Sequence, residues 1–91
     1  MKLALMLCTC LLLAACSGRV ATPAGQECVE SQRIANQELE DAKVKGFGGS
    51  IQWIKAAGLL TDAAVHQQLE KYESCSDKVR RARIYINEAG K

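Results

Sequence analysis

The sequence predicts a small all-α domain of three helices in an up-down-up arrangement, with one disulfide. Apolar residues recur at helical spacing in three segments, and a glycine-rich break at residues 46–50 separates the first two. Two cysteines, Cys28 and Cys75, lie in the region that carries these helices. The 91-residue chain has 12 basic and 10 acidic side chains and a formal net charge of +2, so it is not strongly basic.

The first residues of the chain have the architecture of a signal peptide. A positive charge at Lys2 precedes an apolar run, residues 3–13, that is broken only by Thr9, and small residues follow. The run is too short to cross a membrane, which takes about 20 apolar residues. The sequence Leu13-Ala14-Ala15-Cys16 then resembles the lipobox of bacterial lipoproteins.

This resemblance implies a lipid anchor on Cys16. A diacylglyceryl group would join the Cys16 sulfur, the signal peptide at residues 1–15 would be removed, and the freed amine would be acylated, for example with palmitate. Each buried methylene contributes about 0.8 kcal/mol, so two or three chains anchor stably. An aspartate after the cysteine tends to retain such proteins at the inner membrane, whereas this chain has Ser17. The expected location is the outer membrane, facing the periplasm.

The remaining cysteines are expected to form a disulfide. Cys8 and Cys10 lie in the signal peptide, which leaves Cys28 and Cys75 as a pair in an oxidising compartment. The bridge would close a loop of roughly 45 residues, for which the chain-entropy model gives about 4 kcal/mol. A redox pair or a zinc site would need Cys-x-x-Cys spacing or four ligands, so we expect no metal and no cofactor.

A flexible tether and the first helix are expected next. Residues 16–26 contain the only proline, Pro23, and no apolar periodicity, which indicates a tether. The helical domain, residues 27–91, would begin with a helix from Glu27 to Lys45, in which acidic residues come early and lysines late. Its expected inner stripe consists mostly of small residues: Cys28, Ile34, Ala35, Leu39 and Ala42.

The second helix is expected from Ile51 to Tyr72. Gly46 would end the preceding helix in the left-handed conformation, and Ser50 would cap the new one. A glycine-rich loop can also bind phosphate, but the P-loop residues are absent. Gly58 leaves open one bent helix or two short ones. Two apolar seams are expected to face the other helices, one formed by Ile51, Ile54, Gly58, Thr61, Val65, Gln68 or Leu69, and Tyr72, and one by Trp53, Ala57, Leu60 and Ala64.

The last helix is expected to begin at a serine cap, Ser74 or Ser76. Its predicted inner face consists of Val79, Ala82, Ile86 and Ala89, with Tyr85 beside it. The same helix carries the sharpest charge cluster of the chain, which consists of Lys78, Arg80, Arg81 and Arg83. Either it is a solvated face partly neutralised by Glu27 and Glu30, or it binds an anionic partner.

Two function classes follow from these observations. The first is a non-enzymatic interaction module or accessory subunit that docks on an envelope protein, with an exposed apolar patch on the second helix as its signature. The alternative is a binder of lipid headgroups or lipopolysaccharide through residues 78–83. Nucleic acid is not expected as a partner in this compartment. An enzyme is not expected either, because His66 is the only histidine and Glu38, Glu40 and Asp41 lie on a solvated face.

Overall fold

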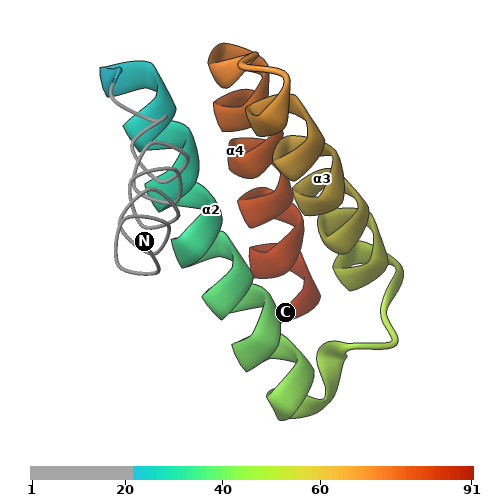
Figure 1. The fold of residues 1–91 in the computed structure, drawn as a ribbon. Coiled ribbons are helices and arrows are strands. Elements are labelled where there is room, and N and C mark those ends of the chain that lie inside the picture. The colour runs from blue at the N-terminus through green and yellow to red at the C-terminus, as the bar shows by residue number, and fades with distance from the viewer. Residues whose placement is uncertain (1–21) are drawn as a thin grey trace, which may run out of the picture.

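The computed structural model describes residues 22–91, so the lipobox, Cys16 and the tether before Thr22 lie outside the described residues. The described chain forms α2 (Pro23–Ala42), the π-helical turn η1 (Lys43–Phe47), α3 (Ile51–Gln68) and α4 (Tyr72–Ala89). Figure 1 shows that α3 runs antiparallel to both α2 and α4. The predicted all-α, three-helix, up-down-up fold is confirmed.

The first helix begins at Pro23, not at Glu27 as expected. The Thr22 hydroxyl caps it by accepting a hydrogen bond of 3.1 Å from the backbone N–H of Gly25. Proline is well suited to the first turn, where its missing N–H has no partner within the helix. The prediction of a flexible tether was therefore wrong for residues 23–26, because this cap extends the helix toward the N-terminus.

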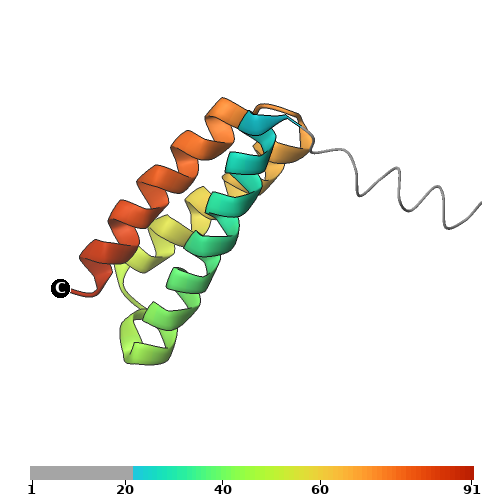
Figure 2. The same ribbon diagram turned by 90° about the vertical axis from the view of Figure 1, so that its left-hand side faces the viewer.

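The predicted end of the first helix at Gly46 and the predicted cap of the second helix at Ser50 are both confirmed. Gly46 adopts a φ of 97°, a conformation that favours glycine and ends the helix. The Ser50 hydroxyl accepts a 3.1 Å hydrogen bond from the backbone N–H of Trp53 and so caps α3. The 20 residues of α2 and the 5 of η1 make this segment longer than α3, which has 18, so its end projects beyond the other helices (Figures 1 and 2).

The second helix is continuous across Gly58 but ends at Gln68, before the expected end at Tyr72. The chain reverses at Leu69 to Lys71, where Glu70 has a φ of 60°. Tyr72 opens α4, and its N-cap is Lys71 with no side-chain hydrogen bond, so the predicted caps Ser74 and Ser76 were wrong. This turn contains no glycine or proline, so no local sequence signal marks it.

The core is narrow and made mostly of small side chains. Its largest fully buried side chains are Val79, Cys28 and Cys75. The predicted inner face of α4 is confirmed, because Val79, Ala82, Ile86 and Ala89 are all buried. The buried apolar residues are Cys28, Ala35, Ala42, Ala56, Leu60, Ala63, Cys75, Val79, Ala82, Ile86 and Ala89. Alanine at so many contacts allows the helices to approach closely, but it buries little apolar area.

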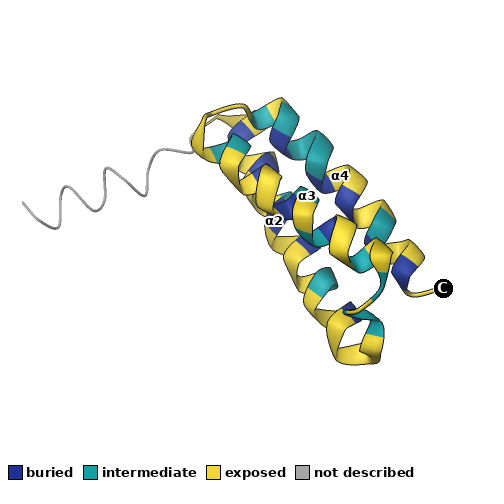
Figure 3. Cartoon of the chain, turned by 90° about the vertical axis from the view of Figure 1, so that its right-hand side faces the viewer, coloured by how far each residue is buried: buried dark blue, intermediate teal, exposed yellow. Residues whose placement is uncertain are grey.

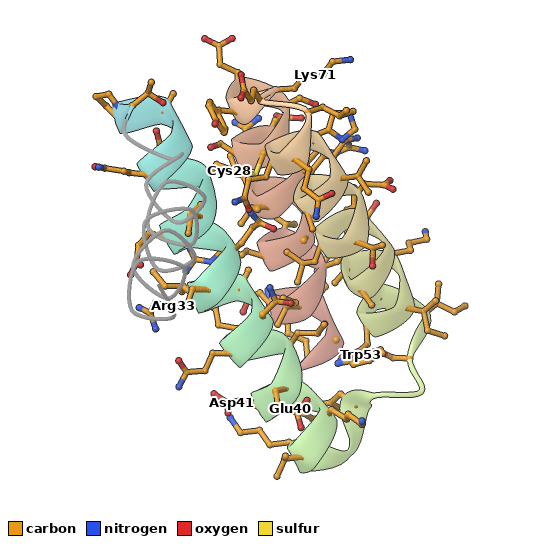
Figure 4. All side chains as sticks on the ribbon, viewed as in Figure 1. Cys28, Arg33, Glu40, Asp41, Trp53 and Lys71 are labelled. Atoms are coloured by element: carbon orange, nitrogen blue, oxygen red, sulfur yellow. A yellow bond between two sulfur atoms is a disulfide. The ribbon has the colours of Figure 1, made fainter. Side chains whose placement is uncertain are left out.

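The predicted disulfide is present and joins α2 to α4. Cys28 lies in the second turn of α2 and Cys75 in the first turn of α4, with Cα atoms 5.7 Å apart. Both cysteines are fully buried, and Figure 4 shows Cys28 between the helices near one end of the bundle. The bridge fixes the two parallel helices at their N-terminal ends.

We expect loss of this disulfide to destabilise the fold by about 4 kcal/mol, because the unfolded chain regains the freedom of a long loop. The test is denaturant unfolding of the Cys28→Ala, Cys75→Ala double variant. As a control, reductant should lower the stability of the wild-type protein to a similar value and leave the double variant unchanged. Equal stabilities of the oxidised wild type and the double variant would contradict this prediction.

Candidate functional site

The outer side of α3 carries a row of exposed apolar residues, which we call the α3 stripe. It consists of Ile51, Ile54, Gly58, Thr61 and Val65 of α3 and of Leu69, the C-cap residue of that helix. Its large side chains are more than half exposed: Ile51 is 67% exposed, Ile54 58%, Val65 51% and Leu69 59%. Figure 3 looks at the molecule from the α3 side and shows many exposed residues along this helix.

The exposure of this stripe corrects the predicted packing of α3. The seam that begins at Ile51 was expected to face another helix, but the buried residues are Ala56, Leu60 and Ala63, on the opposite side. The second predicted seam does approach α2, because the Trp53 indole donates a 2.9 Å hydrogen bond to the Leu39 carbonyl. Ile34 of α2 is also exposed rather than part of the inner stripe.

The choice of buried face has a physical reason. α3 has apolar residues on nearly all sides, so hydrophobicity alone does not select the side that faces the core. Small residues allow α4 and α2 to approach closely at Ala56 and Ala63, whereas the branched side chains of Ile51 and Ile54 would hold them apart. Three helices cover only one side of α3, and its larger aliphatic residues therefore face solvent.

One polar contact in the interior was missed by sequence reasoning. Gln32 of α2 is 8% exposed and donates a hydrogen bond to the Gln67 side chain of α3. Its amide also lies 3.4 Å from the Cys28 sulfur. Gln32 stands four residues after Cys28 and three before Ala35, so its place in the inner stripe was readable from spacing. The contact ties α2 to α3 beside the disulfide.

The basic cluster is close in sequence but spread out in space. Successive residues of an α-helix differ by 100°, so Lys78, Arg80, Arg81 and Arg83 point in different directions around α4. Arg83 forms a 2.6 Å ion pair with Glu38 of α2, and Arg80 pairs with Asp77 of its own helix. The described structure therefore has no single basic face built from these four residues.

The acids that neutralise this cluster differ from the expected Glu27 and Glu30. Glu30 pairs with Arg33 on its own helix at 2.7 Å. The hydrogen bond from Arg33, helped by its charge, lowers the pKa of the Glu30 carboxyl. Arg83 instead meets Glu38, because α2 and α4 run parallel and approach each other along an open groove. The charged residues lining this groove include acids and bases, namely Glu27, Glu38, Asp41, Glu73, Asp77, Glu88, Lys45, Arg80, Arg83 and Lys91.

The remaining candidates for chemistry are separated from one another. Nδ1 of His66 lies 2.8 Å from the Asp62 carbonyl, one turn earlier in α3. Cys28 and Cys75 are joined to each other in the disulfide. Within residues 22–91, no three potential metal ligands of the His, Cys, Asp or Glu type cluster together. No helix in the same part of the chain combines the length and the apolar character that a membrane span requires.

We expect the α3 stripe to be dispensable for folding. Because their side chains are more than half exposed, Ile54→Gln and Val65→Gln should each change the free energy of unfolding by less than about 0.5 kcal/mol. The matched control is Leu60→Gln on the buried face of the same helix, which should cost about 3 kcal/mol. Denaturant unfolding measures all three, and a large loss for the stripe variants would assign the stripe a structural role.

Comparison with known proteins found no match for this chain. No family model, no curated protein and no solved structure is similar to it. No relative therefore assigns a role to the α3 stripe or to the groove between α2 and α4.

Proposed function

We propose that this protein is a lipid-anchored lipoprotein of the bacterial cell envelope whose helical domain is a non-enzymatic interaction module in the periplasm. The observation that carries the proposal is the exposed α3 stripe, where four large aliphatic side chains line up along α3 and its C-cap. Contiguous apolar surface of this kind marks interaction sites in soluble domains. The stripe is the signature that distinguishes docking from binding of anionic ligands.

Docking on the stripe is favoured by the hydrophobic effect. Ile51, Ile54, Val65 and Leu69 are each at least half exposed, and burial of the exposed part of one such side chain contributes about 1 kcal/mol. The fold does not require these side chains, because the residues that pack α3 against its neighbours lie on the opposite face. A protein partner with a complementary apolar face would therefore bind without rearrangement of the bundle.

The lipid anchor is supported by the sequence before Thr22. The lipobox at Leu13-Ala14-Ala15-Cys16 would place a lipidated cysteine six residues before the helix cap Thr22. A segment of this length reaches about 20 Å at most, so the module would stay close to the membrane surface. The buried disulfide suits the oxidising periplasm.

The non-enzymatic role is supported by the state of the reactive side chains. Cys28 and Cys75 are joined to each other and fully buried, so neither supplies a thiolate to His66. His66 lies against the carbonyl of Asp62 on its own helix.

Lipidation is tested by following the processing of the chain in cells. Inhibition of the lipoprotein signal peptidase with a globomycin-type compound should leave a heavier precursor, and Cys16→Ser should release or mislocalise the protein. The readouts are gel mobility, membrane fractionation and the mass of the N-terminal peptide. As a control, Cys10→Ser should leave processing unchanged, because that cysteine lies within the expected signal peptide. A mature protein with an unmodified Cys16 would contradict the proposal.

Docking is tested by photocrosslinking in living cells from Val65, in the stripe. A photoreactive residue at this position should give reproducible adducts with protein, because the side chain points away from the bundle. The control position is Arg81, which is also exposed to solvent but lies on α4. Protein adducts from Arg81 alone, or only lipid adducts from Val65, would count against the stripe as the docking surface.

A further inference from the structure

Two opposite charges accompany the α3 stripe along one flank. Lys55 and Asp62 are the formally charged residues within Ile51–Gln68. They lie seven positions apart, which is close to two helical turns, so they occupy the same flank about 10 Å from each other. Asp62 takes part in none of the ion pairs found among residues 22–91. Lys55 lies over the Tyr85 ring, with Nζ 5.5 Å from its centroid, so this flank faces α4.

The middle of the stripe is occupied by Gly58, midway between these charges. Glycine is among the least favourable residues in the interior of a helix. The fold itself gives no reason for it, because a Cβ built at Gly58 meets nothing within 4 Å. A second helix that crosses the stripe at this point could approach the α3 backbone closely, since no side chain intervenes.

We infer that the partner of the α3 stripe is a second copy of this chain, packed antiparallel about a two-fold axis that passes close to Gly58. This inference rests on the proposed docking function and names its partner. In such a pair, residues equally distant from Gly58 on either side face each other. Ile51 lies opposite the partner's Val65, and Gly58 lies opposite the partner's Gly58.

The charges select this arrangement over a parallel one. A two-fold axis perpendicular to the helices keeps each flank on its own side, so Lys55 meets the partner's Asp62 and the same pair forms again by symmetry. In a parallel pair the two-fold axis runs along the helices and places the two charged flanks on opposite sides of the contact, so neither Lys55 nor Asp62 meets an opposite charge. A helix with one lysine and one acid on the same flank is thus complementary to itself only when antiparallel.

The same charges disfavour the membrane as the occupant of the stripe. Helices that lie in an anionic membrane surface carry an excess of lysine and arginine on their polar face. Here the single lysine beside the stripe is balanced by Asp62, and the opposite face of α3 is the core of the bundle. The contact with a second copy involves one helix from each chain, so it is small. Confinement of both chains to one membrane raises their effective concentration.

Cysteine crosslinking of the full-length chain in membranes tests this geometry. The variants are Gly58→Cys, Ile51→Cys and Val65→Cys, and mild oxidation is followed by non-reducing gel electrophoresis. We expect Gly58→Cys to form disulfide-linked dimers, because its copies meet at the axis. Ile51→Cys and Val65→Cys should each stay monomeric alone but crosslink to each other when co-expressed with different tags. The control Arg81→Cys should stay monomeric.

The ion pair is tested in the Gly58→Cys background. Lys55→Asp or Asp62→Lys alone should reduce the rate of crosslinking about fivefold, because two symmetric surface pairs become repulsive. The double exchange, Lys55→Asp with Asp62→Lys, should restore the rate to within about twofold, since it only reverses each pair. No loss in either single variant would overturn the inferred pairing.

Other outcomes separate this inference from the proposed function. Dimers of all three stripe variants alone would indicate a parallel pair and overturn the inference. Absence of Gly58→Cys dimers, with Val65 photoadducts to a different protein, would also overturn it but leave the docking function intact. Absence of dimers together with only lipid adducts from Val65 would overturn both.

Discussion

The Cys28–Cys75 disulfide is the constraint on which the rest of the domain depends. A core in which the largest fully buried side chains are a valine and two cysteines buries little apolar area. The disulfide compensates for the small buried apolar area, because it lowers the conformational entropy of the unfolded chain. It joins the N-terminal ends of α2 and α4, so that α3 has to return between two helices that are already fixed. Gln32 reinforces the same end through its hydrogen bond to Gln67.

The narrow core also explains why α3 has an apolar outer surface. Alanines face inward because they let three helices pack closely, and the branched side chains of the helix consequently point outward. A fourth helix would normally cover such a surface in a bundle. In the proposed function, the domain is a three-helix scaffold on which α3 would be the surface offered to a partner. A helix from a second copy would complete the missing layer and would bury the side chains that the scaffold leaves exposed.

The charged residues that lie together in the structure are not the ones that lie close together in the chain. The basic residues 78–83 look like a binding motif when read along the sequence, but the helix distributes them around its circumference. Arg83 is bound by Glu38, a residue 45 positions earlier in the chain. Lys55 and Asp62, which look unremarkable in sequence, lie on one flank beside the exposed stripe. Position on the helix surface, and not density along the chain, decides which charges act together.

The sequence by itself determined the number and order of the helices, the glycine turn at Gly46, the Ser50 cap, the inner face of α4 and the cysteine pair. These features depend on local chemistry and on periodicity within one segment. The predicted start of the first helix was too late, because Pro23 and Gly25 are residues typical of a tether. The Thr22 hydroxyl caps the helix ahead of both residues, so both belong to it. Only the tertiary structure decided which side of α3 is buried and where the chain turns before Tyr72. A helix that is apolar on nearly every side carries no amphipathic signal, so the fit of Ala56 and Ala63 against their neighbours made that choice.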